Sequence, residues 1–84
     1  MIPGNAPPDP FEVVARALKR PRESLTEDSA MYRDYGWDSL GHLGVIMEIE
    51  EALGMKIEND EAWALRNMKA ILKLFNTRNG GVQR

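Results

Sequence analysis

The chain has 84 residues, which suits one small domain that buries about two-thirds of its unfolded surface and has little interior for an enclosed substrate site. It has no cysteine and a single histidine, His42, so a disulfide framework, a thiolate metal site and a cysteine nucleophile are excluded and no metal site is expected. The first ten residues lack the basic start and apolar core of a secretion signal, and no apolar run approaches the roughly 20 residues of a membrane span. We therefore expect a cytoplasmic monomer without a membrane span.

The net charge of −2 is spread unevenly along the chain. Between residues 38 and 61, seven acids face one base, Lys56, which gives this segment a charge of −6 and leaves +4 for the remainder. Such an acidic segment repels nucleic-acid phosphates and attracts basic protein surfaces. Nucleic acid is therefore excluded as a partner. The seven acids are Asp38, Glu48, Glu50, Glu51, Glu58, Asp60 and Glu61.

The N-terminal part of the sequence predicts a disordered lead followed by a first helix. Residues 1–8 contain three prolines and a glycine, which favour disorder. Asp9 is a candidate N-cap with Pro10 at the first helical position, and apolar residues then recur at helical spacing until Pro21 prevents continuation. The first helix is expected over residues 10–20. Residues 21–37 show no sustained period and predict a long loop, pinned to the fold by Leu25, Met31, Tyr32 and Tyr35.

Three further helices are predicted. Asp38 is the N-cap candidate of a helix that runs to Leu53, where Gly54 ends it. A short helix begins at Asn59 or Asp60 and reaches Leu65, and a last helix, capped by Asn67, ends before residue 80. No strand pattern is present, so the fold class is all-α: a small four-helix bundle with a long loop after helix 1 and a short third helix. We expect a disordered lead at 1–8, one folded domain at 9–78 and a flexible tail at 79–84.

The helix predicted over residues 39–53 has two different faces. At 100° per residue, one arc of about 120° faces the core and contains His42, Val45, Ile46, Ile49, Ala52 and Leu53. The opposite side carries large apolar residues within an acidic border. This grouping predicts either a docking surface or a second packing contact with the long loop, and the helix pattern leaves both open. The residues of this second face are Leu40, Leu43, Met47, Glu48, Glu50 and Glu51.

Gly41 and Gly44 are unusual residues for a helix, because an interior glycine costs up to about 1 kcal/mol relative to alanine. They either permit close packing by the loop or keep the surface open beside Ser39.

Ser39 lies in the first turn of this helix, where backbone N–H groups are unpaired and the helix dipole is positive. A phosphate on its hydroxyl would be stabilised there by roughly 0.3 to 1 kcal/mol, so the position suits a phosphorylated or phospho-linked serine. The simpler alternative is that Asp38 and Ser39 serve only to cap the helix.

The segment DYGWDSLGHLGVIMEIEEALGMKI resembles the signature of the acyl carrier protein family, in which an aspartate, a serine and a leucine open the second helix after a glycine turn. By this resemblance, Ser39 is the attachment residue of 4′-phosphopantetheine, donated by coenzyme A on a phosphopantetheinyl transferase. Asp38 would help to place magnesium or the transferase. The partners would be acyl-loading and acyl-using enzymes with basic docking surfaces, and the thiol of the prosthetic group would explain the missing cysteine.

The chain departs from this family's pattern at three positions. Many fatty-acid carriers have acids where Gly41 and Gly44 stand, which favours a dedicated polyketide, lipid or other secondary-metabolite pathway. Peptidyl carriers more often have a glycine where Trp37 stands, so an aminoacyl or peptidyl load is the alternative within the family.

The sequence also raises two functions that are unrelated to a carrier. Asp38, Ser39 and His42 lie within one turn and invite a hydrolase interpretation, but a domain of this size has no evident means to build the required cleft and oxyanion hole, so no enzyme is expected. An unmodified acidic helical adaptor would use the same apolar and acidic face to bind a basic groove.

Overall fold

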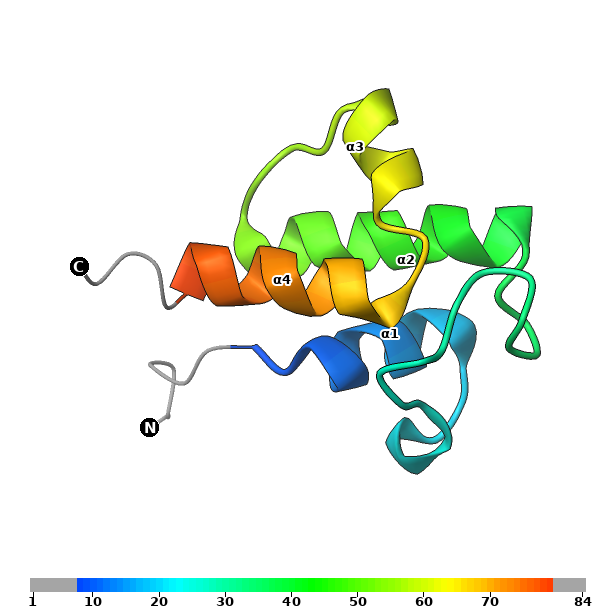
Figure 1. The fold of residues 1–84 in the computed structure, drawn as a ribbon. Helices are drawn as coiled ribbons and strands as arrows, with labels where there is room; N and C mark the ends of the chain where they lie inside the picture. Colours follow the sequence, from blue (N-terminus) through cyan, green and yellow to red (C-terminus); the bar gives the residue numbers. More distant parts are fainter. Residues whose placement is uncertain (1–7, 80–84) are drawn as a thin grey trace.

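The computed structural model describes residues 8–79, and this part of the chain is helical. Its elements are α1 (Pro10–Leu18), the 3-10 turn η1 (Arg22–Ser24), α2 (Ser39–Leu53), α3 (Asn59–Ala64) and α4 (Met68–Asn79) (Figure 1). Figure 1 shows α1, α2 and α4 extending along one common direction, with the short α3 standing across them. The predicted all-α class is confirmed, since residues 8–79 contain no strand beyond one isolated bridge between Ala30 and Asn67.

Local capping chemistry explains where the first helix begins and ends. The Asp9 carboxylate accepts a hydrogen bond from the Phe11 amide at 3.0 Å, and Pro10 occupies the first helical position, as predicted. The helix ends at Leu18, two residues earlier than expected. Lys19 adopts the left-handed conformation with φ 57°, and its amide bonds back to the carbonyls of the last turn, so the helical path stops before Pro21 is reached.

The other helix bounds follow the predicted signals closely. The Asp38 side chain caps α2 and Gly54 ends it at φ 63°. Helix α3 begins at Asn59, one of the two expected residues, but its cap is Glu58, which forms a capping box with Glu61. The Asn67 side chain accepts a hydrogen bond from the Ala70 amide at 2.8 Å, where α4 begins.

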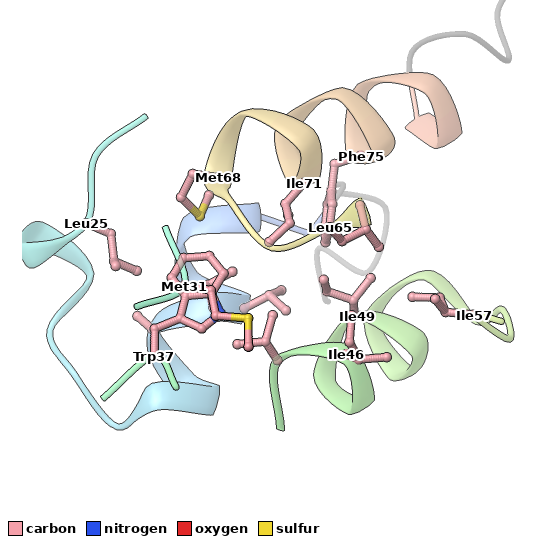
Figure 2. Close-up of a cluster of buried hydrophobic side chains, with 14 residues drawn as sticks. Leu25, Met31, Trp37, Ile46, Ile49, Ile57, Leu65, Met68, Ile71 and Phe75 are labelled. Atoms are coloured by element: carbon pink, nitrogen blue, oxygen red, sulfur yellow. The ribbon is translucent and has the colours of Figure 1, made fainter. Parts of the chain in front are cut away.

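The core gathers buried side chains from α1, α2 and α4, from the loop before α2 and from the segments on either side of α3 (Figure 2). Leu25 and Met31 of that loop are buried, as expected, but the two tyrosines are not: Tyr32 and Tyr35 are exposed. Trp37 is the residue that fixes the end of the loop, since its indole is completely buried. The largest fully buried side chains are Trp37, Ile49, Met68, Ile71, Val14 and Val45.

The predicted lead and tail fall mostly outside the described residues. Residues 1–7 and 80–84 are not described, while Pro8 precedes the cap of α1 and Asn79 is the last residue of α4. Within residues 8–79, none of the helices combines the length and the apolar character that crossing a bilayer requires.

Candidate functional site

Ser39 is the first residue of α2 and is exposed at its N-terminal turn. The residue before it performs the capping: the Asp38 Oδ1 atom accepts a hydrogen bond from the Gly41 amide at 2.8 Å, and the Asp38 carbonyl accepts one from the His42 amide at 2.8 Å. The Ser39 hydroxyl therefore takes no part in the cap. It is exposed at the positive end of the helix dipole, where it hydrogen-bonds with the Tyr32 hydroxyl.

The loop that leads into Ser39 is held by its own backbone. The Tyr32 amide donates to the Trp37 carbonyl at 2.7 Å, and the Trp37 amide donates to the Asp34 carbonyl at 3.1 Å. Arg20, just beyond α1, donates to the Tyr35 carbonyl at 2.9 Å and forms an ion pair with Asp34 at 3.7 Å. These bonds fix the turn against α1, so the start of α2 has a defined position.

His42 is a structural residue in this arrangement. Trp37 Nε1 donates to His42 Nδ1 at 3.0 Å, and because an indole N–H can only donate, the proton of the neutral imidazole lies on Nε2. His42 Nε2 then donates to the Ala62 carbonyl at 2.7 Å. With both ring nitrogens engaged and the side chain buried, His42 has no nitrogen available to activate Ser39. The hydrolase interpretation therefore lacks the general base that His42 would have to supply.

A groove of about 280 Å³ lies between α2 and α3, directly beside Ser39. Trp63 of α3 forms part of its wall and stacks on His42, with ring centroids 5.9 Å apart, and the Trp37 ring centroid lies 6.2 Å from that of the same imidazole. The groove is open and mixed in character, with apolar side chains from α2 and polar groups at its rim. Its lining residues include Ser39, Leu43, Ile46, Met47, Glu50 and Trp63.

The apolar residues of the predicted second face are exposed: Leu40 by 78%, Leu43 by 58% and Met47 by 61%. They are therefore free of the long loop, and the packing alternative for this face is wrong. Of the acids around them, Glu51 is exposed and Glu48 is half-buried. Glu50 has a structural task as well, since its Oε2 atom accepts a hydrogen bond from the Ile57 amide at 2.8 Å.

Both glycines of α2 face α1, not the open surface. A Cβ atom on Gly41 would lie 2.2 Å from the Gly36 carbonyl oxygen and 3.1 Å from Leu18 Cδ2. A Cβ on Gly44 would meet nothing closer than the Ala17 carbonyl oxygen at 3.7 Å, an ordinary contact. The packing alternative therefore applies to Gly41, which lets the turn approach the helix.

Comparison with known proteins identifies the family. Residues 11–75 match the family described as "Phosphopantetheine attachment site". The chain belongs to this family. It is 31% identical over 68 residues to the acyl carrier proteins of Rickettsia massiliae and Rickettsia conorii, covering 81% of this chain and 79% of each relative. It is 27% identical over 63 residues to the acyl carrier protein of Saccharopolyspora erythraea, covering 75% of this chain and 66% of that relative.

Membership confirms the predicted resemblance to the acyl carrier protein family and establishes the class of molecule. The chain is an acyl carrier protein with a phosphopantetheine attachment domain, a carrier and not an enzyme, and its prosthetic group is 4′-phosphopantetheine. An exposed hydroxyl at the start of α2 beside an open groove fits such a group. Tyr32 and Trp63 also belong to this site: Tyr32 reaches Ser39 from the preceding loop, and Trp63 lines the groove from α3. The sequence predicted for Tyr32 only a role in pinning the loop, and helical spacing signals neither contact.

Proposed function

We propose that Ser39 carries the 4′-phosphopantetheine group and that the chain delivers acyl thioesters to enzymes of a dedicated biosynthetic pathway. The observation that carries this proposal is that Asp38 caps α2, which leaves the Ser39 hydroxyl exposed at the start of the helix. The chain has two other serines, and both are less exposed than Ser39. Ser29 is buried and accepts from the Thr26 amide at 2.9 Å, while Ser24 donates to the Pro21 carbonyl at 2.7 Å.

The attachment reaction needs little from the carrier beyond a presented hydroxyl. Ser39 Oγ forms a bond to the phosphorus of coenzyme A that bears the pantetheine, and the bond from that phosphorus to the bridging oxygen breaks. The adenosine half leaves as 3′,5′-ADP, and the serine proton goes to a base of the transferase or to water. The backbone N–H groups and dipole of the first turn of α2 stabilise the resulting phosphodiester. Asp38, adjacent and exposed, is positioned to help a transferase place magnesium.

When attached, the prosthetic group supplies the thiol that this cysteine-free chain lacks. The groove between α2 and α3 begins at Ser39 and offers apolar cover from Leu43, Ile46 and Met47. This groove offers shielding from water to an arm, or its cargo, attached at Ser39.

The docking face comprises Leu40, Leu43 and Met47 with the acids Glu48, Glu50 and Glu51, and we propose that it receives partner enzymes. Its exposed apolar groups supply contact area, and the acidic border attracts basic partner surfaces. The transferase and the acyl-loading and acyl-using enzymes would share it. Because Glu50 is already bonded to the Ile57 amide, Glu48 and Glu51 are the acids we assign chiefly to partners.

The cargo is proposed to belong to a polyketide, lipid or other secondary-metabolite pathway, because residues 41 and 44 bring no acids near Ser39. An aminoacyl or peptidyl load is the second candidate within the family. The cytoplasmic location and the monomeric state stay predictions.

Intact mass tests the assignment of Ser39 directly. Incubation with coenzyme A, magnesium and a promiscuous transferase should add one phosphopantetheine mass, and one thiol should become titratable per chain. Ser39→Ala should abolish both changes and keep its helical circular dichroism, with Ser24→Ala as the matched control that keeps them. A mass gain in the Ser39→Ala variant would refute the assignment, and no gain in wild type would favour an unmodified adaptor.

A further inference from the structure

Tyr32 has a backbone conformation that side-chain-bearing residues seldom adopt. Its φ of 68° lies in the left-handed region, where glycine is favoured. The surrounding turn imposes it: the Tyr32 amide is bonded to the Trp37 carbonyl, and the Arg33 and Asp34 amides both donate to the Ala30 carbonyl at 3.1 Å. An unfavourable conformation that the fold maintains at an exposed residue calls for a functional reason.

Packing does not supply that reason, because the Tyr32 residue is 72% exposed. What the conformation does achieve is a contact across seven residues of sequence: the Tyr32 hydroxyl lies 2.5 Å from Ser39 Oγ. Tyr35, three residues later, is 87% exposed, and it is its backbone carbonyl, not its hydroxyl, that accepts the hydrogen bond from Arg20. The two tyrosines therefore form a natural pair, one aimed at the serine and one not.

We propose that Tyr32 is a positioning residue for the modification of Ser39, an inference that rests on the proposed function of that serine. The two hydroxyl oxygens lie within hydrogen-bonding distance, and in this role the Tyr32 O–H is the donor, which fixes the direction of the serine hydroxyl. The serine proton then points away from the loop, where a base can remove it, and a lone pair stays available for attack on phosphorus. As the proton leaves, the same donor stabilises the negative charge that grows on Oγ.

The contact has a second consequence once Ser39 is modified. Oγ becomes an ester oxygen without a proton, so from then on only Tyr32 can donate in this pair. Because its hydroxyl lies 2.5 Å from Oγ, Tyr32 would hold the base of the arm beside the groove that Ser39 lines. Tyr32 thus acts both on the reaction and on the product.

The test compares Tyr32→Phe with Tyr35→Phe in the transferase reaction. Each change removes one hydroxyl from an exposed ring, so both thermal midpoints should match that of wild type. Tyr32→Phe should lower the kcat of transfer about three- to tenfold, the size of one lost hydrogen bond, and leave the KM for the carrier unchanged. Tyr35→Phe should match wild type in both constants. The ³¹P chemical shift of the attached phosphodiester should change in Tyr32→Phe only.

A third variant separates positioning from folding. Tyr32→Gly suits the left-handed backbone, so it should be at least as stable as wild type, yet it should show the same loss of kcat. The inference is overturned if Tyr32→Phe has a kcat equal to or above that of wild type, or if its ³¹P shift is unchanged. In either case wild type is still modified at Ser39, whereas absence of modification in wild type would refute the proposed function itself.

Discussion

Replacement of Gly41 by alanine should destabilise the fold although alanine is the better helix former. A Cβ at this position would lie 2.2 Å from the Gly36 carbonyl oxygen, and real Cβ contacts are essentially never under 3.0 Å, so the two must separate by at least 0.8 Å. The obstacle is backbone, held between Tyr35 and the completely buried Trp37, and cannot rotate away. Overpacking of this kind costs about 1 to 3 kcal/mol, and the gain in helix propensity returns less than about 1 kcal/mol so near the helix start. A net loss of about 1 to 2 kcal/mol is expected.

Gly44→Ala is the matched control on the same helix. Its Cβ would meet only the Ala17 carbonyl oxygen at 3.7 Å, so the propensity gain of up to about 1 kcal/mol should appear as added stability. Urea denaturation followed by circular dichroism, with thermal melts, measures both variants. A change of 1 kcal/mol moves the midpoint by about 4 to 8 °C in a domain of this size, so the two variants should shift in opposite directions. A Gly41→Ala variant as stable as wild type would refute the close-packing explanation.

Three other outcomes are expected. Glu50→Ala should lower the free energy of unfolding, measured by urea denaturation, by about 1 to 2 kcal/mol, because the buried Ile57 amide loses its carboxylate partner. Glu51→Ala should change it by less than about 0.5 kcal/mol, and equal losses in the two variants would contradict this explanation. Glu51→Lys should slow modification or loading at low salt, and the difference from wild type should shrink towards 1 M salt, as steady-state kinetics can show. The Arg22 guanidinium hydrogen-bonds to Asp9 and holds the pKa of that carboxyl below its ordinary value. The pair therefore stabilises the fold above the unfolded-state pKa of about 3.9, and this stabilisation is lost as the pH falls through the folded-state pKa. The difference in free energy of unfolding between wild type and Arg22→Gln should accordingly disappear on acidification.

The helices could be predicted because their ends depend on neighbouring residues. Asp9, Asp38 and Gly54 act on amides and carbonyls within a few positions, so the sequence alone indicates where the helices that they cap or end begin or stop. The end of α1 also depends on a neighbouring residue, but on one that the sequence does not mark as a stop signal. Pro21 marks the latest possible end, but the actual end depends on Lys19 adopting a positive φ, which its residue type does not favour.

The surroundings of Ser39 could not be predicted in the same way, because they come from contacts between distant segments. Helical periodicity correctly placed His42 towards the core, but its partners are an indole from the loop and a carbonyl 20 residues later. The same holds for Glu50, which the helix wheel assigns to the docking face and which the structure also uses to hold the Ile57 amide. Periodicity gives a residue's face, and only the fold gives its partner.

The site has two sides: the start of α2, which is packed against the preceding turn, and α3, which is held by a few contacts with α2. Ser39 lies on the first of these sides, where Gly41 presses against Gly36 and the turn is bonded to α1 through Arg20. The opposite wall of the groove is α3, whose six residues are too few for a helix to be stable alone. It is held to α2 by the bond from His42 to the Ala62 carbonyl and by the stacking of Trp63 on the same imidazole. Any widening of the groove would therefore require these contacts of α3 to break, whereas the contacts that hold the start of α2 involve other residues.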